Sequence, residues 1–173
     1  TSKAASRLSE EVRNKTFKKN YIVIVNGKME SNHGSMQDYM WKDEKNNTSY
    51  VVRANKPNAK LAELDYEVLK YDEKEDLSVL KVDLHTGRHH QIRVQLSSRM
   101  HAIYGDNKYH GRGAGTQICL WAYKLSIVHP TTKEELTLFF HFFISLMACV
   151  YCTSFFCFNF NSFHYSRFLG KEE

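Results

Sequence analysis

Residues 86–93 constrain the fold most, because a turn signal and a dense polar cluster coincide there. They read Thr-Gly-Arg-His-His-Gln-Ile-Arg. The initial Thr-Gly pair predicts a tight turn, since glycine adopts backbone angles that other residues resist. The preceding residues 77–84 alternate with period two, which predicts a strand. The following residues 89–99 place Ile92 and Leu96 four positions apart, which predicts a helix with one apolar face. The polar cluster is therefore expected at a strand-to-helix turn.

The rest of the first 138 residues is typical of short strands joined by polar turns. Further strands are expected at residues 21–25, 35–42, 48–53, 62–70 and 117–128, and an amphipathic helix at residues 2–14. The last of these strands is expected to end the sheet at His129-Pro130. This pattern predicts one α+β domain built on a mainly antiparallel, mixed sheet with a few helices.

Charge is distributed unevenly along the chain, which carries a formal net charge of +5. Residues 1–28 contain seven Lys or Arg and two acids, and residues 85–112 contain five against one. Residues 63–83 instead contain eight acids and three Lys. A fold that joins the two basic segments would present a basic face suited to a polyanion such as RNA. Ordinary solvated charges would give the same counts.

Four ordered segments resemble the RluA-type pseudouridine synthases. Residues 84–109 carry the octet and then Gly-Asp-Asn-Lys-Tyr, which is similar to the family's Thr-Gly-Arg-x-His-Gln-Ile/Leu-Arg and Gly-Asp-x-x-Tyr. Residues 19–27, 62–69 and 120–130 resemble further family segments in the same order. The resemblance covers residues 1–138 and implies an N-terminally truncated pseudouridine synthase catalytic domain. Such an enzyme isomerises uridine to pseudouridine in structured RNA, either ribosomal or transfer RNA.

The resemblance also implies roles for individual residues. Arg93 is expected to pair with the carboxylate of the family's nucleophilic Asp, in a cleft beside Tyr21 that leaves the place of that carboxylate empty. Tyr21 is expected to be a catalytic residue that lies against the uracil and assists removal of the proton from C5. The residues expected to hold the turn and bind RNA are Arg88, His89, Gln91 and Lys19. Gly105-Asp106 is expected to be structural. No step requires a metal or an organic cofactor.

The family's His-Arg-Leu-Asp segment, which contains the nucleophile, occurs nowhere in the 173 residues. The resemblance places that segment shortly before Thr1. We therefore expect this chain to be a family fragment that is inactive alone. The alternative is a non-catalytic remnant that binds RNA through its basic surface.

Residues 139–173 differ in character from the rest of the chain. Ten of the eleven Phe follow residue 138, and residues 136–166 contain no Asp, Glu, Lys or Arg. Residues 138–158 are long enough to span a bilayer, so a membrane-anchored protein is one alternative. Phe, Ser, Cys, Tyr and Leu share pyrimidine-rich codons, so translated non-coding sequence would give the same composition. We favour that origin and expect the domain to end near Leu138.

No metal site is expected. His85, His89, His90 and His101 lack a Cys or an acid to complete a ligand set, and the two adjacent histidines are expected to point in different directions. The spacing of Cys149 and Cys152 fits a metal or redox pair, but no neighbouring charge would stabilise a thiolate. We expect a monomer of the cytoplasm or an organelle, and the sequence leaves the compartment and the target uridine open.

Overall fold

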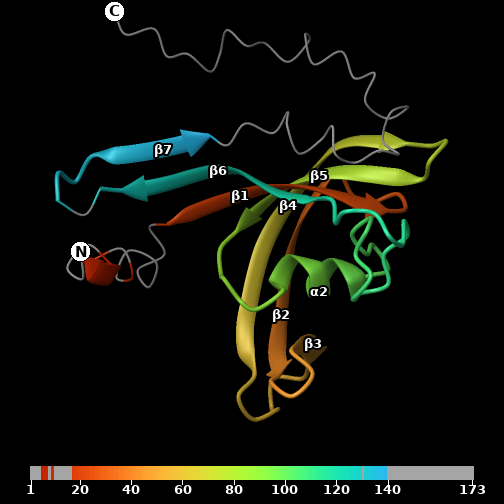
Figure 1. The fold of residues 1–173 in the computed structure, drawn as a ribbon, viewed down its shortest axis with the longest axis horizontal. Coiled ribbons are helices and arrows are strands. Elements are labelled where there is room, and N and C mark those ends of the chain that lie inside the picture. The colour runs from red at the N-terminus through yellow and green to blue at the C-terminus, as the bar shows by residue number, and fades with distance from the viewer. Residues whose placement is uncertain (1–4, 8, 10–16, 130, 140–173) are drawn as a thin grey trace, which may run out of the picture.

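The computed structural model describes residues 5–7, 9, 17–129 and 131–139 (Figure 1). Within them lie the helix α2 (Gln91–Ser97) and the strands β1 (Lys18–Asn26), β2 (His33–Asp43), β3 (Thr48–Val52), β4 (Lys60–Asp72), β5 (Leu77–Leu84), β6 (Leu120–Val128) and β7 (Glu135–Phe139). The strands form one sheet in the order β3-β2-β4-β5-β1-β6-β7. All its pairings are antiparallel. The predicted α+β architecture is confirmed, with an antiparallel sheet throughout the described residues.

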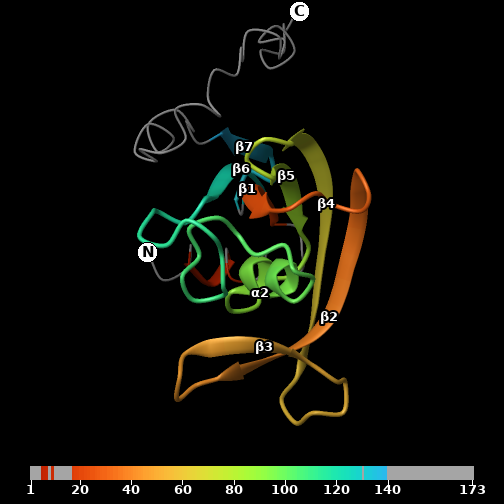
Figure 2. The same cartoon turned by 90° about the vertical axis from the view of Figure 1, so that its right-hand side faces the viewer.

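The strand β1 lies inside the sheet, between β5 and β6, so the N-terminal segment joins two halves of the sheet. The long strands β2 and β4 extend past α2 to the hairpin that β2 forms with β3 (Figures 1 and 2). Residues 73–76 form a polar turn between β4 and β5, between the strands expected at residues 62–70 and 77–84. This arrangement places α2 against one face of the sheet, with β3 beside it.

The core lies between that face of the sheet and α2. Leu64 of β4, Leu80 of β5 and Leu96 of α2 are all buried in it. A second apolar cluster joins Met40, Ala62, Val94 and Tyr109. Because successive side chains of a strand point to opposite faces, the acidic side chains of β4 at 63, 65 and 67 lie on the face away from α2. The alternation of β4 thus separates the core from an acidic face.

The prediction that the sheet ends at His129-Pro130 is wrong, because β7 adds an edge strand. The chain reverses between His129 and Glu134, where the His129 N–H donates to the Glu134 carbonyl at 2.7 Å. Ser126 of β6 then lies opposite Thr137 of β7, and their hydroxyls are 2.9 Å apart. The sheet therefore continues past the His129-Pro130 sequence at which it was expected to end.

Two expectations fall largely outside the described residues. Residues 5–7 and 9 are helical, as predicted, but most of the predicted helix 2–14 is not described. Residues 140–173 are not described either, so the expected end of the domain near Leu138 and the membrane alternative for residues 138–158 stay predictions. In the described part of the chain, no helix has the length and apolar character needed to cross a bilayer.

The packing makes Leu64 a test of the core. Leu64→Ala should lower the free energy of unfolding by about 2–5 kcal/mol, because it removes buried methyl groups and leaves a cavity. Leu69→Ala on the same strand is the control, since Leu69 is 41% exposed. Urea unfolding measures both. Equal losses for the two variants would contradict the placement of Leu64 in the core.

Candidate active site

The turn between β5 and α2 is held by the side chain of Gln91, which is buried. Its Oε1 accepts hydrogen bonds from the Thr86 hydroxyl at 2.8 Å and from the Arg88 N–H at 3.0 Å. Its Nε2 donates to the carbonyl of Glu63 at 3.0 Å. The predicted strand-to-helix turn is confirmed, and Gln91 closes it with contacts inside the protein.

Three of the predicted RNA-binding residues lie on or beside this turn. Arg88 is exposed and its Nε donates to the Leu61 carbonyl at 2.7 Å. His89 Nδ1 lies 2.9 Å from the Ser49 hydroxyl of β3. A Cβ atom on Gly87 would lie 3.5 Å from the Lys19 ammonium, so that cation borders the turn. The fold therefore joins the two basic segments at this point.

Arg93 forms a bidentate ion pair with Asp106. Its Nε donates to Oδ2 at 2.8 Å and its Nη2 donates to Oδ1 at 2.7 Å. The Asp106 side chain is 0% exposed and the Arg93 side chain 21%. The sequence analysis did not expect this partner, which the chain itself supplies. The place for the carboxylate of the nucleophile beside Arg93 stays a prediction. Burial alone would raise the pKa of Asp106, but the Arg93 hydrogen bond and charge outweigh burial and lower it.

The Gly-Asp-x-x-Tyr segment positions this carboxylate. Gly105 has φ +79°, and a Cβ there would lie 2.3 Å from the Gln117 carbonyl oxygen, so only glycine fits. Asp106 Oδ1 also accepts the N–H groups of Lys108 at 3.1 Å and Tyr109 at 3.2 Å. The structural role expected of Gly105-Asp106 is confirmed, and this turn also places the Asp106 carboxylate where it pairs with Arg93.

Tyr109 connects Arg93 to the turn and to β3. The Arg93 Cζ lies 4.9 Å from the centroid of the Tyr109 ring. The Tyr109 hydroxyl accepts the Ser49 N–H at 3.0 Å and lies 2.8 Å from His90 Nδ1. The guanidinium is thus fixed by an ion pair at its edge and by an aromatic ring at its face.

His90 is held neutral in this environment. Burial, followed by the charge of Arg93, lowers its pKa to about 4. Its ring stacks on that of His89 with centroids 3.8 Å apart, so the expectation that the two point in different directions is wrong. The reason is the left-handed backbone of His90, with φ 55°. Among the described residues, no group of His, Cys, Asp and Glu could hold a metal ion.

Tyr21 lies in β1, opposite Val82 of β5 and Ala122 of β6. Its ring packs against the main core, and burial raises the pKa of its phenol. In the described part of the chain, no hydrogen bond joins Tyr21 to Arg93. The placement of Tyr21 beside Arg93 at a uracil therefore stays a prediction.

Sequence reasoning missed the contacts of Asp106, Tyr109 and Ser49. One signal could have indicated Asp106, because it is the only acid in the basic segment 85–112. Nothing in the local sequence indicates Ser49, whose contacts cross 40 and 60 positions of the chain.

Comparisons with known proteins agree on one family. The family model described as RNA pseudouridylate synthase matches residues 1–98. An uncharacterized RNA pseudouridine synthase of Bacillus subtilis, YhcT, is 34% identical over 131 residues, which are 73% of this chain and 41% of that protein. The dual-specificity RNA pseudouridine synthase RluA of Haemophilus influenzae is 34% identical over 140 residues, which are 79% of this chain and 63% of that protein.

Solved structures show the same fold. The human RNA pseudouridylate synthase domain containing 1 superposes with a TM-score of 0.69 at 20% identity, over 81% of this chain and 60% of that one. A second human protein, RNA pseudouridylate synthase domain containing 4, gives a TM-score of 0.63 at 22% identity, over 81% of this chain and 63% of that one. The chain thus spans less than two thirds of each of these relatives.

The ion pair predicts a pH-dependent cost for Asp106→Asn. At pH 7 the variant should lose about 2–3 kcal/mol of unfolding free energy, below the full value for a buried pair because Arg93 is partly exposed. The folded pKa of Asp106 is lowered, so its contribution is complete above the unfolded value of about 3.9 and is lost as pH falls through the folded pKa. Urea unfolding at pH 7 and below pH 4 measures this. A cost that does not shrink in acid would contradict an ionised Asp106.

A further prediction concerns the protonation of His90. Nitrogen chemical shifts of the two rings should show His90 neutral from pH 7 down to about pH 5, with a midpoint near the pKa of about 4. An unfolded imidazole titrates near 6.5, so the unfolded state binds a proton first and this residue destabilises the protein as pH falls from 6.5 toward 4. A His90 midpoint at or above 6.5 would contradict burial beside the Arg93 cation.

Proposed function

We propose that this chain, which belongs to the RNA pseudouridine synthase family, supplies the central and C-terminal part of an enzyme acting on ribosomal or transfer RNA. The observation that carries the proposal is the fixed guanidinium of Arg93. It stands in the octet next to a turn that carries the exposed Arg88, and two residues of the loop before β6, Asp106 and Tyr109, hold it in place.

Arg93 can serve a second carboxylate while it holds Asp106. Asp106 uses Nε and one proton of Nη2, so Nη1 and the other Nη2 proton remain for the Asp nucleophile. The planar fork suits two carboxylates at once, whereas an ammonium is a point charge. A carboxylate kept ionised in an apolar pocket needs such a cation. We therefore propose that Arg93 keeps the nucleophile ionised and oriented.

The proposed reaction breaks the bond between N1 of uracil and C1′ of ribose. The base then turns, C5 bonds to C1′, the C5 proton leaves and N1 gains a proton. The target base must first leave the RNA stack, because its glycosidic bond is inaccessible inside a helix. We propose that the Tyr21 ring contacts this base. Its raised phenol pKa keeps the hydroxyl protonated at neutral pH, so Tyr21 would act through its ring and as a hydrogen-bond donor.

RNA contact is proposed for Arg88, His89 and Lys19. Arg88 is exposed and uses Nε internally, which leaves its terminal nitrogens for phosphate. We propose a structural role for Gln91, because its described hydrogen bonds are all internal. No cofactor takes part in the proposed reaction, and we propose that the protein acts as a monomer.

The alternative is a non-catalytic RNA-binding protein. The 173 residues contain no His-Arg-Leu-Asp segment, so they hold no counterpart of the family's nucleophile. The two candidates make the same prediction for RNA binding and opposite predictions for a protein in which that segment precedes Thr1.

Release of tritium from uridine labelled at C5 tests the proposal. Residues 1–173 alone should release none above an enzyme-free blank. A longer protein that carries His-Arg-Leu-Asp before Thr1 should release it, and Arg93→Lys should lower its kcat by about 100-fold or more, as expected for a lost transition-state donor. Arg99→Lys is the matched control, because Arg99 also makes a bidentate ion pair, with Asp38. No release from the longer protein would favour the RNA-binding alternative.

A further inference from the structure

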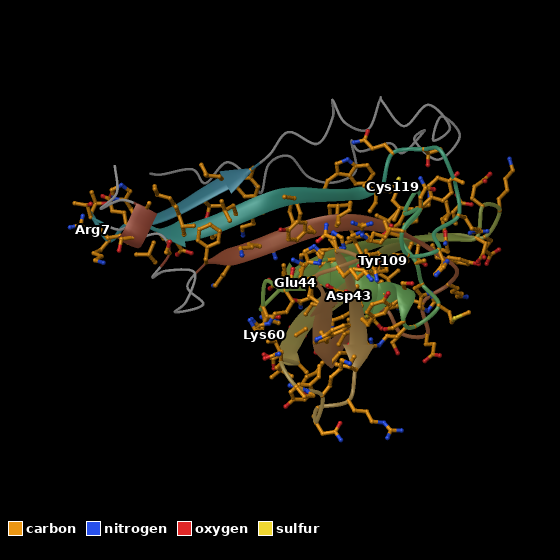
Figure 3. All side chains as sticks on the ribbon, turned by 60° about the horizontal axis from the view of Figure 1, so that its bottom comes forward. Arg7, Asp43, Glu44, Lys60, Tyr109 and Cys119 are labelled. Atoms are coloured by element: carbon orange, nitrogen blue, oxygen red, sulfur yellow. The ribbon has the colours of Figure 1, made fainter. Side chains whose placement is uncertain are left out.

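A groove of about 660 Å³ runs between the β2–β3 hairpin and the turn before α2. The cationic and imidazole side chains that line it are Lys42, Lys45, Lys60, Arg88 and His89. In Figure 3, which draws the side chains, the labels of Lys60, Asp43 and Glu44 mark the groove wall and the label of Tyr109 marks the loop that contacts it. The groove thus begins at residues proposed to bind RNA and continues along a hairpin with no role in the proposed reaction.

The hairpin is fixed to the candidate active site by several contacts. Ser49 of β3 donates its N–H to the Tyr109 hydroxyl, and its own hydroxyl lies 2.9 Å from His89 Nδ1. The Lys108 ammonium donates to the Asn47 carbonyl at 2.7 Å, at the tip of the hairpin. The groove wall is therefore positioned by the same loop that holds Arg93.

The charges in the groove favour an anionic ligand. Lys42 is neutralised by Glu44 at 2.6 Å. Asp43 accepts hydrogen bonds from the backbone N–H groups of residues 45 and 46, so it serves the hairpin turn. Lys45 and Lys60 are exposed and have no ion-pair partner among the described residues. Together with Arg88 they leave the groove with an excess of positive charge.

The surrounding surface would also direct a polyanion to this side of the sheet. Glu63, Asp65 and Glu67 lie on the opposite face of β4, where Glu67 pairs with Lys81 and Asp65 contacts His85. A phosphate chain would be repelled there and attracted to the groove. Lys and Arg side chains spaced along a groove are the usual means of following a nucleic-acid backbone.

We infer that this groove holds the RNA strand adjoining the target uridine, with Lys45, Lys60 and Arg88 against successive phosphates. The inference rests on the proposed function and extends it, because it assigns a binding role to the β2–β3 hairpin. The contacts are to the backbone, so they add affinity without sequence preference.

Fluorescence anisotropy with a labelled single-stranded RNA tests the inference on residues 1–173 over a series of salt concentrations. Each phosphate contact to a single strand contributes about 0.7 to the slope of log K against log salt. Lys45→Ala with Lys60→Ala should therefore weaken binding and make the slope shallower by about 1.4. The control is Lys74→Ala, which removes an exposed cation from the turn between β4 and β5 and should leave the slope unchanged.

A second pair of substitutions, Arg88→Ala with Lys19→Ala, separates this inference from the proposed function. If that pair weakens binding and Lys45→Ala with Lys60→Ala does not, the groove is not the RNA path, while the proposed RNA contacts at the turn stand. If Lys74→Ala changes the slope as much as a groove variant, net charge explains binding and the groove inference is overturned. If the wild-type affinity is independent of salt, both the groove and the proposed RNA contacts fail.

Discussion

The ion pair between Arg93 and Asp106 connects the parts of this molecule that matter for function. It joins the helix α2 to the loop before β6, and through Tyr109 that loop contacts the hairpin of β2 and β3. Burying a carboxylate is costly unless its partner and its other acceptor sites are satisfied. Asp106 meets this condition, because Arg93 and two backbone N–H groups fill its acceptor sites. Removing either charge would leave the other without its partner.

A second chain of polar contacts runs under α2 and sets its position on the sheet. Gln91 donates to Gln95 at 3.0 Å, and Gln95, also buried, donates to Asp38 of β2 at 2.7 Å. The Asp38 carboxylate in turn accepts hydrogen bonds from both terminal nitrogens of Arg99. Buried amides whose donors and acceptors are satisfied hold the helix at one position on the sheet, whereas contacts between apolar side chains alone would tolerate small shifts of the helix. The direction in which Arg93 points therefore depends on amides that lie on the opposite side of its helix.

Local patterns predicted most of the fold. The alternation of residues 77–84, the Thr-Gly pair of the octet and the spacing of Ile92 and Leu96 predicted the strand, the turn and the helix, because those features depend on neighbours in the chain. The edge strand β7 was missed because Pro130 interrupts the strand pattern of the sequence. The residues that follow nevertheless form a strand, because their backbone groups pair with those of β6. Pairings between distant residues were not predictable from local periodicity. Local periodicity also gave no sign that Arg93 pairs with Asp106, thirteen positions further along the chain.

The site predictions also differ according to whether they depend on neighbouring or on distant residues. The octet singled out Arg93 and Arg88 by their positions in a motif, and the structure places Arg88 at the turn and Arg93 in the first turn of α2. The stacking of His89 and His90 depends on the left-handed backbone of His90, a conformation that is uncommon for residues other than glycine and that the sequence pattern did not indicate. The contact of Ser49 with Tyr109 depends on how β3 bends toward α2, which only the complete sheet determines.

The cations of this surface fall into two classes that respond differently to salt. Arg93 is mostly buried against Asp106, where counterions have little access, so its geometry should change little between low and physiological salt. Lys45, Lys60 and Arg88 are exposed and would exchange counterions for phosphates. The proposed affinity for RNA and the position of the Arg93 guanidinium can therefore vary independently. A surface of this kind can release RNA as salt rises without disturbing the ion pair on which the proposed chemistry depends.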